Sequence, residues 1–301
     1  MHSAPSAVVI GAGLSGLTAA ARLRAAGASV TVLESAAAPG GLVRTETVDG
    51  HRFDTGATVL TMPGLIEAAL EPLGVPAATT RERLALRPVD PGYVMNYADG
   101  SSLAIPRDTS RLPAAAVTAF GPGADRGIPE LLAWLRDIDD AEFDVFIDRN
   151  YGGLRDLTGP ATRRAARRLI GLGALGGLTG AVARFVDDER LQRAFTFQAL
   201  YAGVAPHRAR AIYAIIADMD IGQGLSTPAG GMSRIGEVMA GALTEAGVNI
   251  RYGETVTRLA DAGGRVTAVH TAAGERLAAD AVIATGERDA VAALLGRRPR
   301  R

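Results

Sequence analysis

The sequence predicts an α/β fold in which a parallel-sheet domain is interrupted by an inserted α+β domain. Three observations support this. Residues 7–34 show a strand–helix–strand pattern, residues 110–224 are mostly helical in pattern with breaks at Pro and Gly, and β-rich segments return toward the end. A strand–helix–strand unit of this length is a crossover between parallel strands. We therefore expect one domain at 1–90 and 225–301, with 91–224 inserted into it.

The first crossover consists of three short segments. Residues 7–13 form an apolar run typical of a buried strand. Residues 14–26 are rich in Ala and Leu, as in a helix, and Gly27 follows as a C-terminal stop signal. Residues 29–34 form a second β-rich run, which completes the unit.

Turn signals mark the later elements. Asp99-Gly100 is typical of a hairpin turn between β-rich runs at 93–97 and 102–105. A helix is expected after Gly230-Gly231, ending near Ala246. Glycine pairs and polar residues then separate further expected strands, at 248–251, 256–259, 266–270 and 281–284.

Composition excludes several classes of function. The chain has 301 residues, of which 48% are hydrophobic, and no cysteine, so disulfides, thiolate catalysis and Cys-based metal sites are excluded. The formal net charge of zero argues against nucleic acid as a partner. The first residues show no secretory signal, so we expect a cytoplasmic protein. Metal-ligand spacing is also missing among the four histidines, His2, His51, His207 and His270.

A glycine motif lies between the first strand and the first helix. Gly11, Gly13 and Gly16 form a G-x-G-x-x-G pattern in the strand-to-helix context that it requires. Gly11 permits the tight turn, Gly13 lets the backbone approach a pyrophosphate, and Gly16 allows close packing of helix on strand. The helix N-terminus then offers unpaired N–H groups to phosphates. This pattern predicts a dinucleotide site.

An acidic residue at the end of the second strand narrows the choice of dinucleotide. Glu34 stands there, and a carboxylate in this place accepts hydrogen bonds from ribose hydroxyls and repels a 2′-phosphate. FAD or NAD is therefore favoured over NADP. The alternative is a glycine turn with an unrelated surface glutamate.

The residues that follow favour FAD over NAD. Gly40-Gly41 and Arg44 come just past the second strand, and Gly56-Ala57-Thr58 comes shortly afterwards. Two further glycine-mediated backbone approaches suit a cofactor much longer than ADP, although Gly40-Gly41 alone is also consistent with a simple loop. These features predict a Rossmann-type FAD-binding domain.

At this point the sequence resembles bacterial-type phytoene desaturases and related carotenoid desaturases, from about Ala7 to Leu295. The most specific segment is Phe-Asp-Thr-Gly-Ala-Thr-Val-Leu-Thr-Met-Pro at 53–63. Further segments that carry the resemblance are 8–34, 38–45, 86–91, 194–201, 211–216 and 228–232.

The resemblance implies a role for each matching residue. It places the first glycine motif and Glu34 on the ADP moiety, and Gly40, Gly41 and Arg44 along the pyrophosphate and ribityl chain. It places 56–58 near the flavin ring and the backbone of Val256 at the adenine. The implied cofactor-binding residues are Gly11, Gly13, Leu14, Gly16, Glu34, Gly40, Gly41, Arg44, Gly56, Ala57, Thr58 and Val256.

Two departures from the family pattern stand out. Many relatives carry Arg directly after the glycine pair, where this chain has Leu42. Relatives also continue into more of the substrate domain and a second glycine-rich flavin motif, whereas this sequence stops at Arg301. We therefore expect a C-terminally truncated form that lacks part of the flavin cover and substrate tunnel.

The implied function is FAD-dependent desaturation of an apolar polyene such as phytoene, with hydride transfer to flavin. No catalytic residue is identified. Asp148 and Arg149, near an aromatic run, are polar candidates, but surface charge is the better interpretation of them. The alternatives are another FAD-dependent oxidase, of the amine or protoporphyrinogen oxidase type, and an inactive truncated flavoprotein. The sequence indicates no oligomeric state.

A segment in the insert suggests contact with a membrane surface. Four arginines, Arg163, Arg164, Arg167 and Arg168, precede an uncharged run at 169–183, which is shorter than the roughly 20 residues of a bilayer span. Arginines at this spacing share one helix face and suit anionic headgroups. One hypothesis is a peripheral site over 163–184 at the inner membrane face. The other is a buried helix with a solvated basic flank.

Overall fold

The structure, a computed structural model, describes residues 4–147 and 149–297. It divides into two compact units that the chain connects twice. Unit 1 comprises Met1–Arg87 with Thr227–Arg301, and unit 2 comprises Pro88–Ser226.

The two connections are short strands. They are β5 (Leu86–Pro88) and β8 (Ser226–Pro228), which pair with each other in a two-stranded sheet. The boundaries expected from the sequence lie at 90/91 and 224/225, close to these strands. Unit 2 is therefore a continuous insertion into unit 1.

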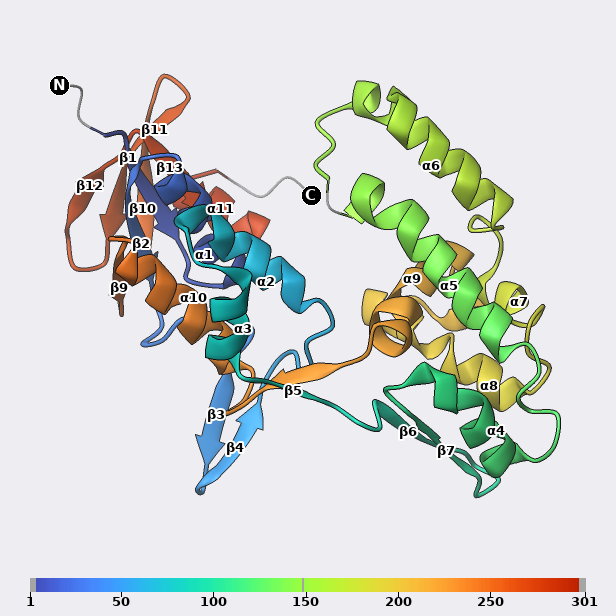
Figure 1. Ribbon diagram of the computed structural model, residues 1–301. Helices are drawn as coiled ribbons and strands as arrows, with labels where there is room; N and C mark the ends of the chain where they lie inside the picture. The colour runs from blue at the N-terminus through green and yellow to red at the C-terminus, as the bar shows by residue number, and fades with distance from the viewer. Residues whose placement is uncertain (1–3, 148, 298–301) are drawn as a thin grey trace. The chain divides into compact units, whose positions relative to one another are not determined.

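Unit 1 is built on a four-stranded parallel sheet in the order β13-β1-β2-β9 (Figure 1). Both flanking strands come from the last part of the chain. The strands are β1 (Ser6–Ile10), β2 (Ser29–Glu34), β9 (Asn249–Tyr252) and β13 (Ala281–Ala284). The helices are α1 (Leu14–Ala25), α2 (Pro63–Leu70), α3 (Ala77–Leu84), α10 (Ser233–Glu245) and α11 (Arg288–Leu294).

Both faces of this sheet are buried, as is usual for parallel strands. Successive side chains of a strand point to opposite faces. Ala7 and Val9 of β1 therefore join a core with helices α1, α2 and α10, whereas Val8 joins a second core. The second core lies against an antiparallel sheet of β10 (Val256–Ala262), β11 (Arg265–Thr271) and β12 (Arg276–Ala278).

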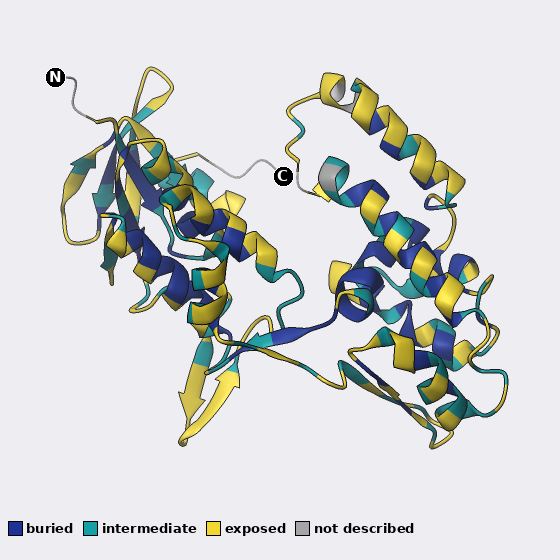
Figure 2. Cartoon of the chain, in the orientation of Figure 1, coloured by how far each residue is buried: buried dark blue, intermediate teal, exposed yellow. Residues whose placement is uncertain are grey.

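A hairpin that the sequence analysis did not anticipate extends from unit 1. It consists of β3 (Thr45–Val48) and β4 (His51–Asp54), paired in antiparallel register. Figure 2 shows exposed residues over most of both strands. Only Thr45 and Asp54, which face each other at its base, are partly buried.

Unit 2 combines a hairpin with packed helices, in agreement with the α+β insert expected. The hairpin is β6 (Tyr93–Asn96) and β7 (Ser102–Ile105). The helices are α4 (Leu112–Phe120), α5 (Ile128–Glu142), α6 (Pro160–Gly171), α7 (Leu178–Val182), α8 (Glu189–Ala194) and α9 (Ala214–Ala217). A π-helical turn, Asp218–Gly222, follows α9 directly.

Helix α5 is the centre of the unit 2 core. Leu131, Leu135 and Ile138 are fully buried and recur at helical spacing, which forms one apolar face. Glu142 continues the same face into the core and is also buried. Helix α5 contacts α6, α9 and the π-helical turn.

The run at 169–183 is not one continuous helix. Helix α6 ends at Gly171, and Gly173, with a φ of +77°, turns the chain before α7 begins. Leu169 and Leu178 are buried, so part of the run belongs to the core. Every helix in the described part of the chain is too short or too polar to cross a bilayer.

Candidate functional site

The glycine turn between β1 and α1 is closely packed. Gly11 adopts a φ of +103°, which ends β1 at Ile10 rather than at residue 13 as the sequence suggested. A Cβ added to Gly16 would lie 2.0 Å from the Gly11 carbonyl oxygen, so α1 packs directly on the turn. Gly13 is the N-cap of α1 and gives it no side-chain cap. The first N–H groups of a helix have no partner within it, so this turn offers donors to an anion.

Glu34 is packed against this glycine turn, and it is not an unrelated surface glutamate. Its Oε2 accepts a hydrogen bond from the Ala12 N–H at 2.6 Å, and its Oε1 accepts one from the Ala36 N–H at 2.8 Å. The residue is 9% exposed. Oε1 also accepts from the Ser35 hydroxyl at 3.3 Å. These bonds fix the carboxylate beside the glycine motif, where Oε2 still has a second lone pair for an incoming hydroxyl.

The second glycine pair contacts the first motif. The Gly40 N–H donates to the Ala12 carbonyl at 2.9 Å, and Gly40 forms a parallel bridge with Gly13. A Cβ on Gly41 would lie 3.0 Å from the Gly13 Cα. The two loops therefore lie backbone against backbone, so Gly40-Gly41 is more than an unattached surface loop.

These loops line a cavity of about 510 Å³ in unit 1. The carboxyl end of the sheet is where ligands bind in open α/β folds, and the lining residues follow the ends of β1, β2 and β13. Seven residues expected from the sequence line it, namely Gly11, Gly13, Leu14, Glu34, Gly40, Gly41 and Val256. Lining residues that the sequence analysis missed include Glu254, Thr255, Thr285 and Gly286.

Thr285 is the most informative of the missed residues. Its hydroxyl donates to the Ile10 carbonyl at 3.0 Å, which joins the end of β13 to the end of β1. The signal that could have found it is its place directly after a predicted parallel strand. Using that signal required knowing that this strand lies next to β1.

The other five expected residues do not line the cavity. Gly16 is buried beneath the turn, and Arg44 is exposed. Residues 56–58 are exposed as well, but a Cβ on Gly56 would lie 1.9 Å from the Leu42 carbonyl oxygen. Gly56 therefore holds the loop that follows the glycine pair, and Leu42, 85% exposed, lines the cavity itself.

The residues present fit the ADP half of a dinucleotide. Backbone donors at the glycine turn suit the diphosphate, and Glu34 suits the ribose. The side chains that line the cavity include two carboxylates, Glu34 and Glu254, and no arginine. A 2′-phosphate would therefore face negative charge without a cationic partner, which disfavours NADP.

Unit 2 contains polar groups of a different kind. The Tyr93 hydroxyl donates to Asp220 Oδ2 at 2.6 Å and lies 3.2 Å from the Tyr201 hydroxyl. Asp220, on the π-helical turn, is 5% exposed, and burial raises its pKa. The hydrogen bond from Tyr93 partly compensates for the burial of this carboxylate, and no sequence pattern marks the pair. Of the earlier candidates, Asp148 lies outside the described residues and Arg149 is exposed.

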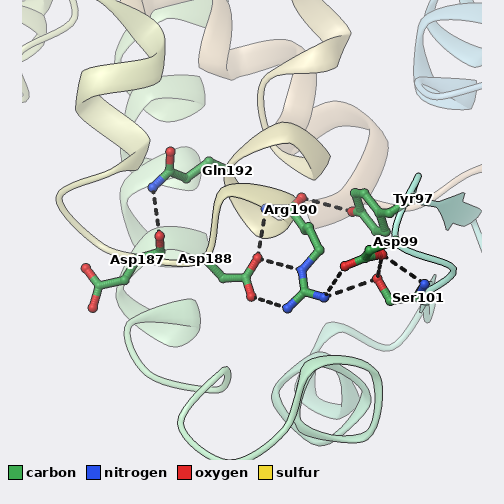
Figure 3. A network of polar contacts seen from close by, with 7 residues as sticks. All are labelled: Tyr97, Asp99, Ser101, Asp187, Asp188, Arg190 and Gln192. Atoms are coloured by element: carbon green, nitrogen blue, oxygen red, sulfur yellow. Dashed lines mark hydrogen bonds and ion pairs between the residues drawn. The ribbon is translucent and has the colours of Figure 1, made fainter.

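A second network in unit 2 is structural (Figure 3). Arg190 forms ion pairs with Asp188 at 2.7 Å and Asp99 at 2.9 Å. Its guanidinium lies 4.0 Å from the centroid of the Phe120 ring, within the range of a cation–π contact. This network ties the turn of the β6–β7 hairpin to α8. Within 4–147 and 149–297, no group of acidic or histidine side chains has the arrangement of a metal site.

The chain is similar to known flavoproteins over almost its whole length. The family of flavin-containing amine oxidoreductases matches residues 14–300. A phytoene dehydrogenase from Streptomyces griseus is 43% identical over 294 residues, which is 98% of this chain and 56% of that protein. A zeta-carotene-forming phytoene desaturase from Myxococcus xanthus is 34% identical over 282 residues, which is 93% of this chain and 53% of that protein. The chain spans about half the length of the curated relatives it matches.

Solved structures show the same fold at lower identity. Putrescine oxidase bound to putrescine matches with a TM-score of 0.59 and 19% identity, over 99% of this chain and 62% of that chain. A fatty acid isomerase from P. acnes matches with a TM-score of 0.58 and 14% identity, over 98% of this chain and 62% of that chain. At such identities the likeness shows the fold alone.

Proposed function

Because the chain belongs to the family of flavin-containing amine oxidoreductases, we propose that it binds FAD and that it desaturates a carotenoid precursor such as phytoene. The observation that carries the cofactor assignment is the Glu34 carboxylate fixed beside the glycine turn in the same cavity. Identity of 43% to a phytoene dehydrogenase supports the substrate class. The amine oxidase alternative is supported by the family match and by a shared fold at 19% identity.

We assign the ADP moiety to the cavity of unit 1. The N–H groups that begin α1, after Gly13, bind the diphosphate, and Glu34 accepts hydrogen bonds from the ribose. Gly11 and Gly16 shape the turn, and the backbone of Val256 faces the adenine. Gly40 and Gly41 follow the diphosphate toward the ribityl chain.

Four of the expected cofactor-binding residues are exposed and lie away from the cavity. Arg44 and the segment 56–58 lie outside the cavity, so their proposed roles at the ribityl chain and the flavin ring rest on the family motif alone. Leu42 lines the cavity where many relatives have arginine, so this chain offers one cation fewer to the diphosphate.

The chemistry divides between cofactor and protein. When bound, FAD would supply the acceptor for the hydride that leaves one substrate carbon, while a proton leaves the adjacent carbon to solvent and the C–C single bond becomes double. The residues of this chain hold the cofactor in register and keep water away from it. An apolar polyene binds best in apolar surroundings, so few polar groups are expected near it. Accordingly, no catalytic residue is identified from the sequence.

Titration of the purified protein with FAD tests the cofactor assignment. The visible flavin spectrum should change on binding, and Glu34→Gln should raise the Kd for FAD about tenfold or more, because the charged acceptor is lost. Glu82→Gln, an exposed change on α3, is the matched control. Equal FAD affinity of the Glu34 and Glu82 variants, or no FAD binding by the wild type, would refute the assignment.

Anaerobic mixing tests the substrate class. Phytoene in detergent should bleach the flavin absorbance of the FAD-loaded protein, whereas simple amines should not. Bleaching by amines with release of peroxide would favour the amine oxidase alternative. Tight FAD binding with no bleaching by any of these compounds would indicate a flavoprotein fragment that lacks activity.

We further propose that α6 contacts an anionic membrane surface at the inner face of the membrane. Arg163 and Arg167 are exposed on the same helix face as Ile170, which is 61% exposed. Leu175, just beyond the helix, is also 61% exposed. Arginine beside exposed aliphatic residues suits headgroups above acyl chains. Arg168 differs, because it pairs with Asp137 at 2.5 Å.

Liposome co-sedimentation tests the membrane proposal. Binding to vesicles that contain phosphatidylglycerol should exceed binding to neutral vesicles and should weaken with salt. Arg163→Gln with Arg167→Gln should reduce binding, whereas Arg155→Gln, also on the surface of unit 2, should not. Equal sedimentation with neutral and anionic vesicles would refute this proposal.

A further inference from the structure

The base of the β3–β4 hairpin is joined to the start of α10 by side-chain hydrogen bonds. Asp54 Oδ1 accepts from the Thr45 hydroxyl at 2.5 Å and from the Met232 N–H at 3.0 Å. The Thr45 hydroxyl in turn accepts from the Ser233 N–H at 3.2 Å. Helix α10 has no side-chain cap at its own N-cap residue. The hairpin therefore supplies the cap from elsewhere in the chain.

Close backbone packing surrounds this cap. A Cβ on Gly231 would lie 2.6 Å from the Thr45 hydroxyl oxygen and 3.0 Å from Asp54 Oδ1. Gly231 has a φ of +97°, so a side chain there would be strained for a second reason. The absence of a side chain at Gly231 thus lets Thr45 and Asp54 of the hairpin approach the backbone before α10.

One turn further along, α10 contacts the loop that lines the cofactor cavity. A Cβ on Gly236 would lie 2.8 Å from the Gly40 Cα and 2.9 Å from the Gly40 nitrogen. Gly40 and Gly41 in turn lie on Gly13 of the first motif. Contacts between backbones leave no flexible side chain to absorb a shift, so a displacement of α10 would reach the cavity wall.

The loop at 40–44 is therefore fixed at both ends on the first turns of one helix. Its beginning, Gly40, rests on Gly236, and its end leads directly into Thr45, which is hydrogen bonded to Ser233. Across the hairpin base, the Thr55 N–H donates to the Arg44 carbonyl at 2.9 Å. The loop is thereby closed.

From this arrangement we propose that Asp54 and Thr45 are positioning residues of the cofactor site. They hold the 40–44 loop against the glycine turn by fixing the start of α10, and they touch no cofactor themselves. This inference rests on the proposed binding of FAD in the cavity of unit 1. It assigns a function to the Phe-Asp-Thr-Gly segment at 53–56 that is separate from any contact with the flavin ring.

Paired substitutions at the two positions test the proposal. Asp54→Ala removes the acceptor of both hydrogen bonds and should raise the Kd for FAD at least tenfold, which corresponds to about 1.4 kcal/mol. Asp54→Asn keeps an acceptor oxygen and should remain within about threefold of the wild type. Thr45→Val and Thr45→Ser form the same pair for the hydroxyl. Glu46→Gln, exposed on β3, is the matched control.

A second measurement separates positioning from general stability. The thermal midpoint of the FAD-free protein and its affinity for ADP are measured for each variant. Loss of FAD and ADP affinity in Asp54→Ala and Thr45→Val, restored in Asp54→Asn and Thr45→Ser, supports positioning. A lower midpoint with unchanged affinities shows a structural role only and overturns the proposal.

The remaining outcomes are equally decisive. If Asp54→Ala yields no soluble protein, Thr45→Val, which removes a single hydroxyl, provides the comparison. Wild-type protein that fails to bind FAD refutes the proposed function before any variant is compared. Wild-type binding with equal affinities in all variants refutes only the role of Asp54 and Thr45.

Discussion

Glu142→Gln should make the protein more stable at alkaline pH. Glu142 is 6% exposed, and its Oε2 has no hydrogen-bond partner among the described residues. Burial, with a smaller contribution from the charge of Asp139, raises the pKa of Glu142 from 4.5 to about 7. A difference of about 2.5 in pKa corresponds to about 3 kcal/mol.

The sign follows from proton binding. Between pH 4.5 and about 7 the folded protein keeps the Glu142 proton that the unfolded chain has released. The free energy of unfolding therefore falls as pH rises through this window, and it does not recover above it. Glutamine has a similar shape and no charge, so Glu142→Gln should remove this loss, with a gain of about 3 kcal/mol at pH 8 and little change at pH 4.5.

Urea unfolding followed by tryptophan fluorescence measures this effect. Trp134 is the only tryptophan, and it is buried on α5, the helix that carries Glu142. The assay therefore reports the packing of this helix directly. Glu130→Gln, exposed near the start of α5, is the control. A Glu142→Gln variant with the same pH dependence as the wild type, or with lower stability at pH 8, would refute the reasoning.

Two glycines in unit 1 should respond oppositely to alanine. Gly16→Ala should abolish FAD binding and lower the thermal midpoint, because its Cβ would meet the Gly11 oxygen at 2.0 Å. Gly241→Ala, in α10 with open space around it, should stabilise the helix by about 0.5–1 kcal/mol. In unit 2, Tyr93→Phe should destabilise by about 1–3 kcal/mol at neutral pH, since buried Asp220 loses its donor. Urea unfolding at neutral pH measures this loss, and a Tyr93→Phe variant as stable as the wild type would contradict the prediction.

The first crossover could be predicted because its signals are local. Strand, turn, helix and acid follow one another within 7–34, and only the end of the strand was misplaced, because the left-handed Gly11 stops it at Ile10. The β3–β4 hairpin was missed because neither strand has a buried face to give an alternating pattern. A turn signal was present, since Asp49-Gly50 has positive φ at both residues, as type I′ hairpins require.

The cavity shows the same division between local and distant information. Gly11, Glu34 and Gly40 could be found from one short stretch of sequence. Thr285 lines the cavity only because β13 pairs with β1. The order of strands in a sheet cannot be predicted from short stretches of sequence. The burial of Glu142 is equally hidden, because a glutamate at the end of an amphipathic helix is usually solvated.

The strand order β13-β1-β2-β9 has a consequence for synthesis on the ribosome. The central strands β1 and β2 emerge first, whereas β9 and β13 follow only after the whole of unit 2. At about 5–20 residues per second, the gap between β2 and β13 lasts roughly 10 to 50 s. During this time the nascent sheet has two open edges, which are prone to pair with other chains. Unit 2 is a continuous segment made in that interval, so we expect chaperones to be needed chiefly at the open edges of β1 and β2.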